Sequence, residues 1–410
     1  MKAVLVQQVD KKNMGKIKKI GYSLKDISVV QAPISYQLHR GDVNPFVETC
    51  GRETYPIFVA PMAAVTDENN YKLWIENKLT PVVPRSVQGN LSITERLDIA
   101  TETFVSFSLS EITEMYNDNI FETYLSNGVK IFVCIDIAHG TLSSLYEICS
   151  LLKSKYDDRI IIMTGNIATP EAYIEYCKRG IDYVRISVGS GSRCTSACNT
   201  SIYYPMATLL DEINEIRKTL DFNSNNLLKE TKVIADGGIG WFDDIQKALV
   251  LGADYVMIGK MFAECEEACS PIIYLHKDKP SVIDAISKED YDEKLSLMNS
   301  ELNTAIDRGD NNKVSEIQAA IANLRKRLPY RNYFGMSCKI AQKITGGDGS
   351  KTAEGISKPV EVKYPVSKLM SNMESYLRSC MTYTNSKNIY DLKNAEVIIL
   401  GGSGDFAYRK

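Results

Sequence analysis

Residues 170–196, PEAYIEYCKRGIDYVRISVGSGSRCTS, contain the unit that decides the fold of this chain. Its first part, Pro170 to Gly180, has apolar residues three and four positions apart and ends in glycine, which is typical of an amphipathic helix. The second part, Tyr183 to Val188, is a short β-branched run that predicts a strand. A glycine–serine turn follows and contains Cys194. The stretch therefore predicts a helix, a strand and a loop, in that order.

The same alternation recurs along much of the chain. Eight short apolar runs are separated by segments with helical periodicity, such as residues 242–252. The runs are Ile57–Ala60, Pro81–Val83, Phe104–Phe107, Lys130–Ile137, Arg159–Gly165, Tyr183–Val188, Lys232–Ile239 and Tyr255–Gly259. Eight strand–helix units predict an α/β fold of the (β/α)8 TIM barrel class. No G-x-G-x-x-G fingerprint opens the first unit, which disfavours a dinucleotide-binding open sheet.

A different pattern follows the eighth strand. Residues 282–307 and 312–328 are rich in Lys, Glu, Asp, Ala and Leu, and a short polar break separates them. This pattern is typical of two helices exposed to solvent. We therefore expect one barrel domain over residues 1–410, with a helical-hairpin insertion at residues 276–330.

A second unusual segment follows this insertion. Residues 344–351, ITGGDGSK, are polar and glycine-rich, a composition that suits a mobile segment over the mouth of a barrel. We therefore expect a mobile C-terminal flap at residues 337–365.

Composition limits the class of protein. The net charge of −3 over 410 residues argues against a nucleic-acid or membrane-surface partner, and no segment resembles a membrane span or a signal peptide. Ten scattered cysteines are typical of reduced thiols, so we expect a cytoplasmic protein. With three histidines and no zinc-type spacing, we expect no metal site.

The candidate phosphate site follows the last two barrel strands. Gly237 and Gly238 end the seventh strand, and Gly259 and Lys260 end the eighth. Barrel enzymes often hold phosphate at this place, where backbone N–H groups and a cation can bind it. Asp236 would then accept hydrogen bonds from sugar hydroxyls.

Cys194 is the candidate nucleophile. It lies just after the turn Gly189–Ser192, whose successive N–H groups can cradle an anion. A thiol at this place would meet a bound phosphorylated substrate.

With these motifs in view, the chain resembles the IMP dehydrogenase/GMP reductase family from about residue 26 to residue 393, apart from the hairpin. The matching motifs are Val59–Met62, Asp136–Gly140, Thr164–Thr169, Gly189–Thr195, Ile234–Ile239, Met257–Gly259, Tyr333–Ser337, Ala353–Gly355 and Leu377–Met381.

The resemblance implies a purine nucleoside monophosphate as substrate and a nicotinamide cofactor. It implies that Cys194 attacks C2 of the purine and forms a covalent thioimidate. It places the phosphate against Ser192, Gly237, Gly238, Gly259 and Lys260, the ribose against Asp236, and the rest of the nucleotide against Tyr333, Gly335 and Met336.

The resemblance also assigns residues to the cofactor side and to the thiol. Asp136 would contact the cofactor ribose, and Asn166 would lie next to the reacting base. Arg185 is the third residue assigned to cofactor binding. Arg185 or Arg193 would help to hold Cys194 as a thiolate.

The two activities of the family differ in how the thioimidate is resolved. The dehydrogenase transfers hydride to NAD and uses an Arg–Tyr pair on its flap to activate water. The reductase expels ammonia from GMP and takes hydride from NADPH, with help from a hydroxyl–glutamate relay. Here only eighteen positions separate Met336 from Glu354, and no Arg–Tyr pair lies between them. Ser196 and Glu354 can form the relay, so we predict a GMP reductase with Cys194, Ser196 and Glu354 as catalytic residues.

Two alternatives stay open. The sequences of residues 189–192 and 234–236 are more similar to the dehydrogenase pattern, which favours an NAD-dependent oxidation of IMP to XMP. The other alternative is a catalytically inactive nucleotide-binding protein. Four departures from the family pattern bear on either activity, the reductase or the dehydrogenase: Ser196 for threonine, Ala63 for an acidic residue, Arg85 for lysine, and Lys260 for a small residue.

Assembly and control are expected by resemblance alone. A barrel of this family is expected to form a homotetramer. Gly189, Gly191 and Cys194 are candidates to hold a monovalent cation such as K⁺, as in the dehydrogenase. Because only about twenty residues separate Arg85 from Phe104, we expect no regulatory nucleotide modules between the second and third strands.

Overall fold

Eight parallel strands form a closed barrel in the computed structural model, which describes residues 20–85, 91–125, 128–222, 228–278, 280–344, 350 and 352–401. The strands pair in the order β10-β11-β4-β5-β6-β7-β8-β9, and the last closes on the first. They are β4 (Ile57–Val59), β5 (Thr80–Val83), β6 (Phe104–Phe107), β7 (Ile131–Asp136), β8 (Ile160–Ile167), β9 (Tyr183–Ile186), β10 (Lys232–Asp236) and β11 (Tyr255–Ile258). Each of the eight predicted runs contributes one strand, so the predicted (β/α)8 barrel is confirmed.

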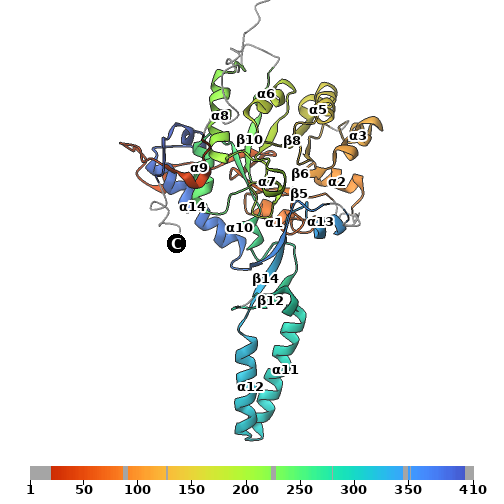
Figure 1. The fold of residues 1–410 in the computed structure, drawn as a ribbon, viewed down its shortest axis with the longest axis vertical. Helices are drawn as coiled ribbons and strands as arrows, with labels where there is room; N and C mark the ends of the chain where they lie inside the picture. The colour runs from red at the N-terminus through yellow and green to blue at the C-terminus, as the bar shows by residue number, and fades with distance from the viewer. Residues whose placement is uncertain are drawn as a thin grey trace, which may run out of the picture.

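Helices surround this barrel (Figure 1). They are α1 (Tyr71–Glu76), α2 (Ile93–Ile99), α3 (Leu109–Asn117), α4 (Ile120–Leu125), α5 (Ser143–Tyr156), α6 (Pro170–Lys178), α7 (Ser196–Thr200), α8 (Met206–Thr219), α9 (Phe242–Val250), α10 (Lys260–Ala263) and α14 (Val366–Tyr383). Local sequence sets their starts: Ser108 and Glu111 form a capping box at α3, and Pro170 occupies the first turn of α6. Within the described ranges, no helix is both long and apolar enough to cross a membrane.

Short elements complete the described part of the chain. Strands β1 (Ile27–Val29) and β16 (Val397–Ile399) pair antiparallel, as do β2 (Val47–Thr49) and β3 (Arg52–Thr54). The 3-10 helices are η2 (Leu24–Asp26), η3 (Arg40–Asp42), η5 (Asp157–Arg159), η6 (Val282–Asp284) and η7 (Ile389–Asn394).

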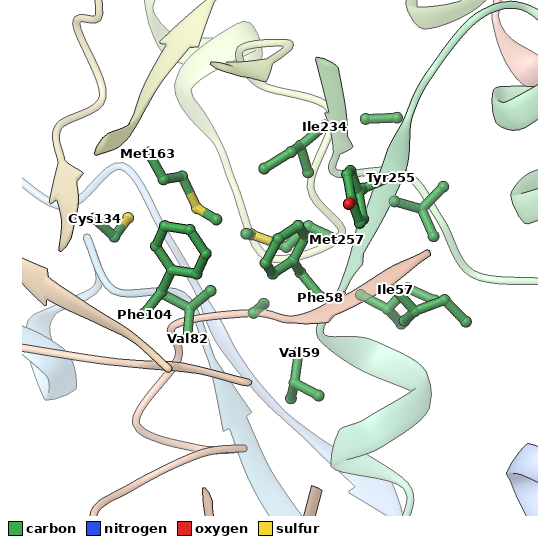
Figure 2. Close-up of a cluster of buried hydrophobic side chains, with 14 of the residues drawn as sticks. Ile57, Phe58, Val59, Val82, Phe104, Cys134, Met163, Ile234, Tyr255 and Met257 are labelled. Carbon is green, nitrogen blue, oxygen red and sulfur yellow. The ribbon is translucent and has the colours of Figure 1, made fainter. Parts of the chain in front are cut away.

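Large apolar side chains fill the interior of the barrel (Figure 2). The ring of Phe104 lies 5.7 Å from that of Phe58 and 5.3 Å from that of Tyr183, both in edge-to-face arrangements. Phe58 and Phe104 have no exposed surface, and truncation of such a ring costs about 3–5 kcal/mol. The barrel is therefore a packed core, and ligands are restricted to its ends.

The hairpin extends away from the barrel (Figure 1). It consists of α11 (Lys288–Asp307) and α12 (Asn311–Leu324), which share a small core of Ala305, Ile317 and Ile321. The first helix begins at residue 288 rather than at residue 282, because Ser287 caps it by accepting a hydrogen bond from the N–H of Asp290.

A four-stranded antiparallel sheet connects the hairpin to the barrel, and the sequence did not predict it. Its strand order is β13-β12-β14-β15, with β12 at Ile272–His276, β13 at Ile286–Ser287, β14 at Arg327–Phe334 and β15 at Ser357–Glu361. The second predicted helix therefore ends at Leu324, and the residues from Arg327 onward form a strand instead.

The predicted flap, residues 337–365, begins with helix α13 (Lys339–Ile344) and contains strand β15, which pairs with β14. Residues 345–349 and 351 of this range lie outside the described residues. The mobility of the flap stays a prediction.

Candidate active site

A cavity of about 970 Å³ lies at the carboxyl ends of the barrel strands. Every residue that the sequence assigned to the substrate, to the cofactor or as the nucleophile lines this cavity. Of the three predicted catalytic residues, Cys194 and Glu354 line it and Ser196 does not. The predicted residues on its surface are Asp136, Asn166, Arg185, Gly189, Gly191, Ser192, Cys194, Asp236, Gly237, Gly238, Gly259, Lys260, Tyr333, Gly335, Met336 and Glu354.

Cys194, Ser196 and Glu354 form a continuous hydrogen-bonded chain. The thiol of Cys194 lies 3.3 Å from the hydroxyl oxygen of Ser196, and this hydroxyl donates a 2.5 Å hydrogen bond to Glu354 Oε2. Ser196 is 8% exposed, whereas the thiol of Cys194 opens on the cavity. The arrangement can move a proton between the Glu354 carboxylate and a group bound beside the thiol.

Backbone hydrogen bonds hold Glu354 against the cysteine loop. The N–H of Thr195 donates to the carbonyl of Glu354 at 2.8 Å, and the N–H of Ile356 donates to the carbonyl of Arg193 at 2.9 Å. Cys194 and Gly355 therefore form an isolated antiparallel bridge. A Cβ on Gly355 would lie 3.0 Å from the hydroxyl of Ser337, so a larger residue would crowd this bridge. The register of the bridge is what places the Glu354 side chain at Ser196.

Asp236 lies at the end of β10 in a dense polar network. Its Oδ2 accepts hydrogen bonds from Asn166 Nδ2 at 2.8 Å and from Arg185 Nε at 3.0 Å. Arg185 Nη1 also donates to Asp136 Oδ1 at 2.7 Å. Burial would lower the pKa of Arg185, but the carboxylates of Asp236 and Asp136 outweigh burial and raise it well above its usual range. Arg185 is thus a permanent cation that binds both carboxylates.

This network changes the role expected for Arg185. The sequence suggested that it helps to hold Cys194 as a thiolate, but its guanidinium instead bonds the carboxylates on β7 and β10 and lies near the Cys134 sulfur. Arg193 lies beside the thiol in sequence, and its guanidinium covers the ring of Tyr333 at 4.9 Å.

Two glycine loops form the expected phosphate side of the cavity. Gly237 and Gly238 have φ values of +100° and +77°, which favour glycine. A Cβ on Gly237 would lie 2.4 Å from the hydroxyl of Ser190, and one on Gly259 would lie 2.7 Å from Tyr333 Oη. These glycines let three loops approach each other closely at this edge of the cavity.

Lys260 lies on this side, but a carboxylate holds its ammonium group. Lys260 Nζ donates to Glu264 Oε1 at 2.8 Å, and Lys363 Nζ lies 3.0 Å from Glu264 Oε2. Glu264 is buried, and the two lysines leave a net positive charge beside Gly259. Lys260 is therefore anchored where an anion would meet it.

Tyr333 and Met336 bring the β14 region into the cavity. The phenol of Tyr333 lies 3.4 Å from Met62 Sδ, and burial raises the pKa of Tyr333 to about 12, so this phenol is neutral at physiological pH. The sulfur of Met336 accepts a hydrogen bond from the N–H of Ala63 at 3.4 Å.

The sequence missed part of the cavity wall. Ser23, Leu24 and Lys25 line the cavity because the segment before β1 crosses the barrel end. The N–H of Tyr22 donates to Thr208 Oγ1 at 2.7 Å and fixes this segment to α8. No sequence motif marks these residues, since their role depends on the fold of distant segments.

Among the described residues, no group of three or more His, Cys, Asp or Glu side chains is arranged to hold a metal ion. In the candidate cation turn, the carbonyl of Gly191 already accepts a hydrogen bond from the N–H of Cys194 at 2.9 Å. A K⁺ site at Gly189, Gly191 and Cys194 stays a prediction.

Comparison with known proteins identifies relatives named IMP dehydrogenase and relatives named GMP reductase. Residues 106–282 match the family model described as "IMP dehydrogenase / GMP reductase domain". An inosine-5'-monophosphate dehydrogenase of Chlorobaculum parvum is 29% identical over 267 residues, 65% of this chain and 44% of the relative. GMP reductase 1 of Mus musculus is 30% identical over 158 residues, covering 38% and 43% respectively.

A GMP reductase of Buchnera aphidicola is 32% identical over 186 residues, 45% of this chain and 49% of the relative. The chain thus spans less than half the length of these relatives. The matched region holds β6 to β11, including the loop with Cys194. Residues 106–282 of this closed barrel, which has its cavity at the carboxyl end, thus match the IMP dehydrogenase/GMP reductase domain.

Proposed function

We propose that this protein is a purine nucleotide oxidoreductase that reduces GMP to IMP and ammonia at the expense of NADPH. The observation that carries the proposal is the chain from Cys194 through Ser196 to Glu354. A nucleophile beside a hydroxyl that is bonded to a carboxylate has the parts needed to expel an amine and to protonate it.

Cys194 supplies covalent catalysis. Its sulfur adds to C2 of the guanine ring, and the thiol proton passes through the Ser196 hydroxyl to the Glu354 carboxylate. The C2–N bond of the exocyclic amine then breaks, and the amine leaves as ammonia. The product of this half-reaction is a thioimidate, in which C2 is bonded to sulfur. The covalent bond divides one difficult substitution into two easier steps.

Ser196 and Glu354 handle the proton of the leaving amine. The Ser196 hydroxyl donates its proton to the departing nitrogen, and Glu354, held by the backbone bridge at Cys194, replenishes it with the proton taken up from the thiol. Because Ser196 is nearly inaccessible to solvent, the proton comes from the relay rather than from bulk water.

The cavity fits a nicotinamide beside the nucleotide. Its volume of about 970 Å³ is at the upper end for a single small ligand. The half lined by Asp136 has a carboxylate that can accept hydrogen bonds from a ribose diol. When bound there, NADPH supplies the hydride that reaches C2 as the bond to sulfur breaks. We propose Asp136 and Asn166 as the residues that hold it.

The other half of the cavity suits the nucleotide. We propose that the backbone of Ser192, Gly238 and Gly259 holds the 5′-phosphate, with Lys260 as its cation. Asp236 keeps Oδ1 for a ribose hydroxyl because Oδ2 is bonded to Asn166 and Arg185. Tyr333, Gly335 and Met336 would line the remaining wall.

Oxidation of IMP to XMP with NAD is the second candidate. The relative from Chlorobaculum parvum, which matches 65% of this chain, is named an inosine-5'-monophosphate dehydrogenase. Against it, residues 337–353 contain neither arginine nor tyrosine, so the pair that the resemblance assigns to water activation has no counterpart there.

The deciding experiment measures the absorbance of reduced nicotinamide with purified protein in two mixtures. With GMP and NADPH, we expect a loss of absorbance and the release of one ammonia per NADPH consumed. A rise with IMP, NAD and K⁺, and no change in the first mixture, would show the dehydrogenase instead. Neither change, combined with nucleotide binding, would show a catalytically inactive nucleotide-binding protein.

We also propose that the protein forms a homotetramer, as the family resemblance suggests. Light scattering coupled to size exclusion tests this, and the mass of a single chain would contradict it.

A further inference from the structure

Arg85 is a charged residue of the cavity to which the proposed reaction gives no role. From its place we infer that Arg85 is a specificity residue that shifts the preference of the barrel away from the oxidised form of a nicotinamide dinucleotide and toward the reduced form. The inference deepens the proposed function and rests on it, because it concerns the cofactor half of the same cavity.

The barrel topology places Arg85 on that half. Arg85 follows β5 and Asp136 ends β7, whereas the glycine loops of the phosphate side follow β10 and β11. In the closed strand order, β7 lies diametrically opposite β11, and β5 is separated from β10 by two strands. A nucleotide with its phosphate at β10 and β11 and its base at Cys194 leaves the β5–β7 half for the second ligand.

The charged groups around Asp136 have a net charge of zero only when Arg85 is included. Arg185 is bonded to both Asp136 and Asp236, so these three groups together carry one net negative charge. Arg85 Nη2 lies 4.0 Å from Asp136 Oδ2, on the opposite side of this carboxylate from the Arg185 bond to Oδ1. With Arg85 the cluster is neutral, and Asp136 lies between two guanidinium groups.

Arg85 is accessible to a ligand. Its side chain is 39% exposed and lines the cavity. A guanidinium group is a permanent cation in proteins, so the charge at this place is fixed.

A fixed positive charge distinguishes the two redox forms of a nicotinamide. The oxidised ring carries a positive charge and the reduced ring is neutral, while the rest of the dinucleotide is the same. Without Arg85 the net negative cluster would attract the oxidised ring, and with Arg85 that attraction is cancelled. The ratio of the two dissociation constants therefore reports the charge at the ring and not the contacts made by the phosphates.

The test is calorimetric titration of NADPH and NADP⁺ into the full chain saturated with GMP. The variant Cys194→Ala serves as background so that no turnover occurs. We compare Arg85→Gln and Arg85→Lys with the matched control Arg159→Gln. Arg159 precedes β8, at the opposite end of the barrel, so its replacement changes the net charge equally but far from the cavity.

We expect Arg85→Gln to lower the ratio of the NADP⁺ to the NADPH dissociation constant by about tenfold, equivalent to ~1.4 kcal/mol. Arg85→Lys should keep most of the original ratio, and Arg159→Gln all of it. The dissociation constant of GMP, which binds the other half, should change less than about twofold and so report an intact fold.

Equal weakening of both dinucleotides by Arg85→Gln would overturn the inference, because Arg85 would then contact their phosphates. An unchanged ratio would overturn it as well. If neither dinucleotide binds the background variant while GMP does, the proposed nicotinamide chemistry itself is wrong.

Discussion

The Ser196 hydroxyl donates a 2.5 Å hydrogen bond to Glu354 although the two residues are 158 positions apart in the chain. The antiparallel bridge between Cys194 and Gly355 brings them together, and it fixes the thiol in the same unit. Any movement of the 354–356 segment relative to the cysteine loop would separate the carboxylate from the hydroxyl. The nucleophile and its proton relay are therefore assembled or lost together.

Glu354→Gln tests the end of this relay. The amide keeps the size of the side chain and can still contact Ser196, but it has no proton to supply. We expect kcat for NADPH oxidation with GMP to fall by about 10²–10⁴-fold, since this is the usual contribution of a positioned acid–base group. The KM for GMP should change little.

The matched control for this variant is Glu361→Gln, at the far end of β15 in the same polypeptide segment. It removes one carboxylate outside the cavity, and we expect activity within about twofold of the original. Full activity of Glu354→Gln would contradict the assigned role.

Ser196→Ala tests whether the hydroxyl and the carboxylate act as one unit. Loss of the hydroxyl leaves Glu354 without its donor, so we expect a fall in kcat comparable to that of Glu354→Gln. The double variant should be no more than about threefold worse than either single variant, because groups that act in series are not additive. Ser196→Thr keeps the hydroxyl and should stay active. Additive losses in steady-state kinetics would show two independent roles.

Thiol labelling distinguishes Cys194 from the structural cysteines. Burial raises the pKa of Cys134 and Cys380 to about 11 and that of Cys50 to about 12, so only a very small fraction of these thiols is ionised near neutral pH. We expect a 2-chloropurine nucleoside monophosphate to modify one cysteine per chain, Cys194, as located by peptide mass spectrometry.

GMP should protect against this labelling, and Cys194→Ser should abolish it. Cys198 is exposed too, but it lies on helix α7, after the cysteine loop. The variant Cys198→Ser is therefore the control, and its Cys194 should still be labelled fully. Modification of a different cysteine would mean that the nucleotide binds elsewhere.

The barrel strands could be predicted because their environment depends little on partners. Ile57, Phe58 and Val59 are all buried, as expected for a strand between helices and barrel interior, and such strands are continuous apolar runs. The β15 strand gives no such signal, since its sequence SKPVE contains two charges and a proline. It is a strand only because it pairs with β14 at the edge of a sheet, where Pro359 is tolerated.

The residues of the candidate site also fall into those that the sequence could predict and those that it could not. Cys194, Ser196 and Glu354 could be chosen from motifs because their chemistry is local to each motif. The true partners of Arg185 could not, because they depend on the register of β7, β9 and β10 across the barrel mouth. Lys25 lines the cavity through the path of a distant segment, which no local pattern reports.

Removal of the hairpin should leave the barrel intact. The apolar cluster of Ala305, Ile317 and Ile321 is separate from the barrel core. Strands β13 and β14 run parallel to each other on either side of β12, with Ser287 opposite Ile273 and Arg327 opposite His276, so a crossover of about a dozen glycine and serine residues can replace residues 288–325.

We expect the shortened chain to keep its activity within about threefold and its Tm within a few degrees, because no core residue of the barrel is lost. Differential scanning calorimetry and NADPH oxidation measure these effects. A large loss of activity would show that the hairpin supports the sheet that carries Tyr333.

Asp254→Asn tests a buried charge network at the opposite end of the barrel from the cavity. Asp254 accepts hydrogen bonds from the N–H of Val233 at 2.7 Å and from Lys393 Nζ at 2.9 Å, and Arg217 Nη1 lies 3.1 Å away. Burial would raise the pKa of Asp254, but Arg217 and Lys393 outweigh it and hold the pKa below its usual value. Loss of this carboxylate removes the partner of Lys393 and leaves Arg217 with Glu230 alone, so we expect ~3 kcal/mol less free energy of unfolding at neutral pH.

The pH dependence follows from the direction of that shift. A carboxylate whose pKa is lower in the folded state stabilises the fold fully above its unfolded pKa of about 4, and this stabilisation disappears as pH falls through the lower, folded value. Urea unfolding of the original chain should therefore show a steeper loss of stability below about pH 4 than Asp254→Asn, and the two curves should converge. Asp278→Asn, at an exposed carboxylate, is the control and should follow the original chain at every pH. A constant difference between the curves down to acid pH would mean that Asp254 acts through packing and not through its charge.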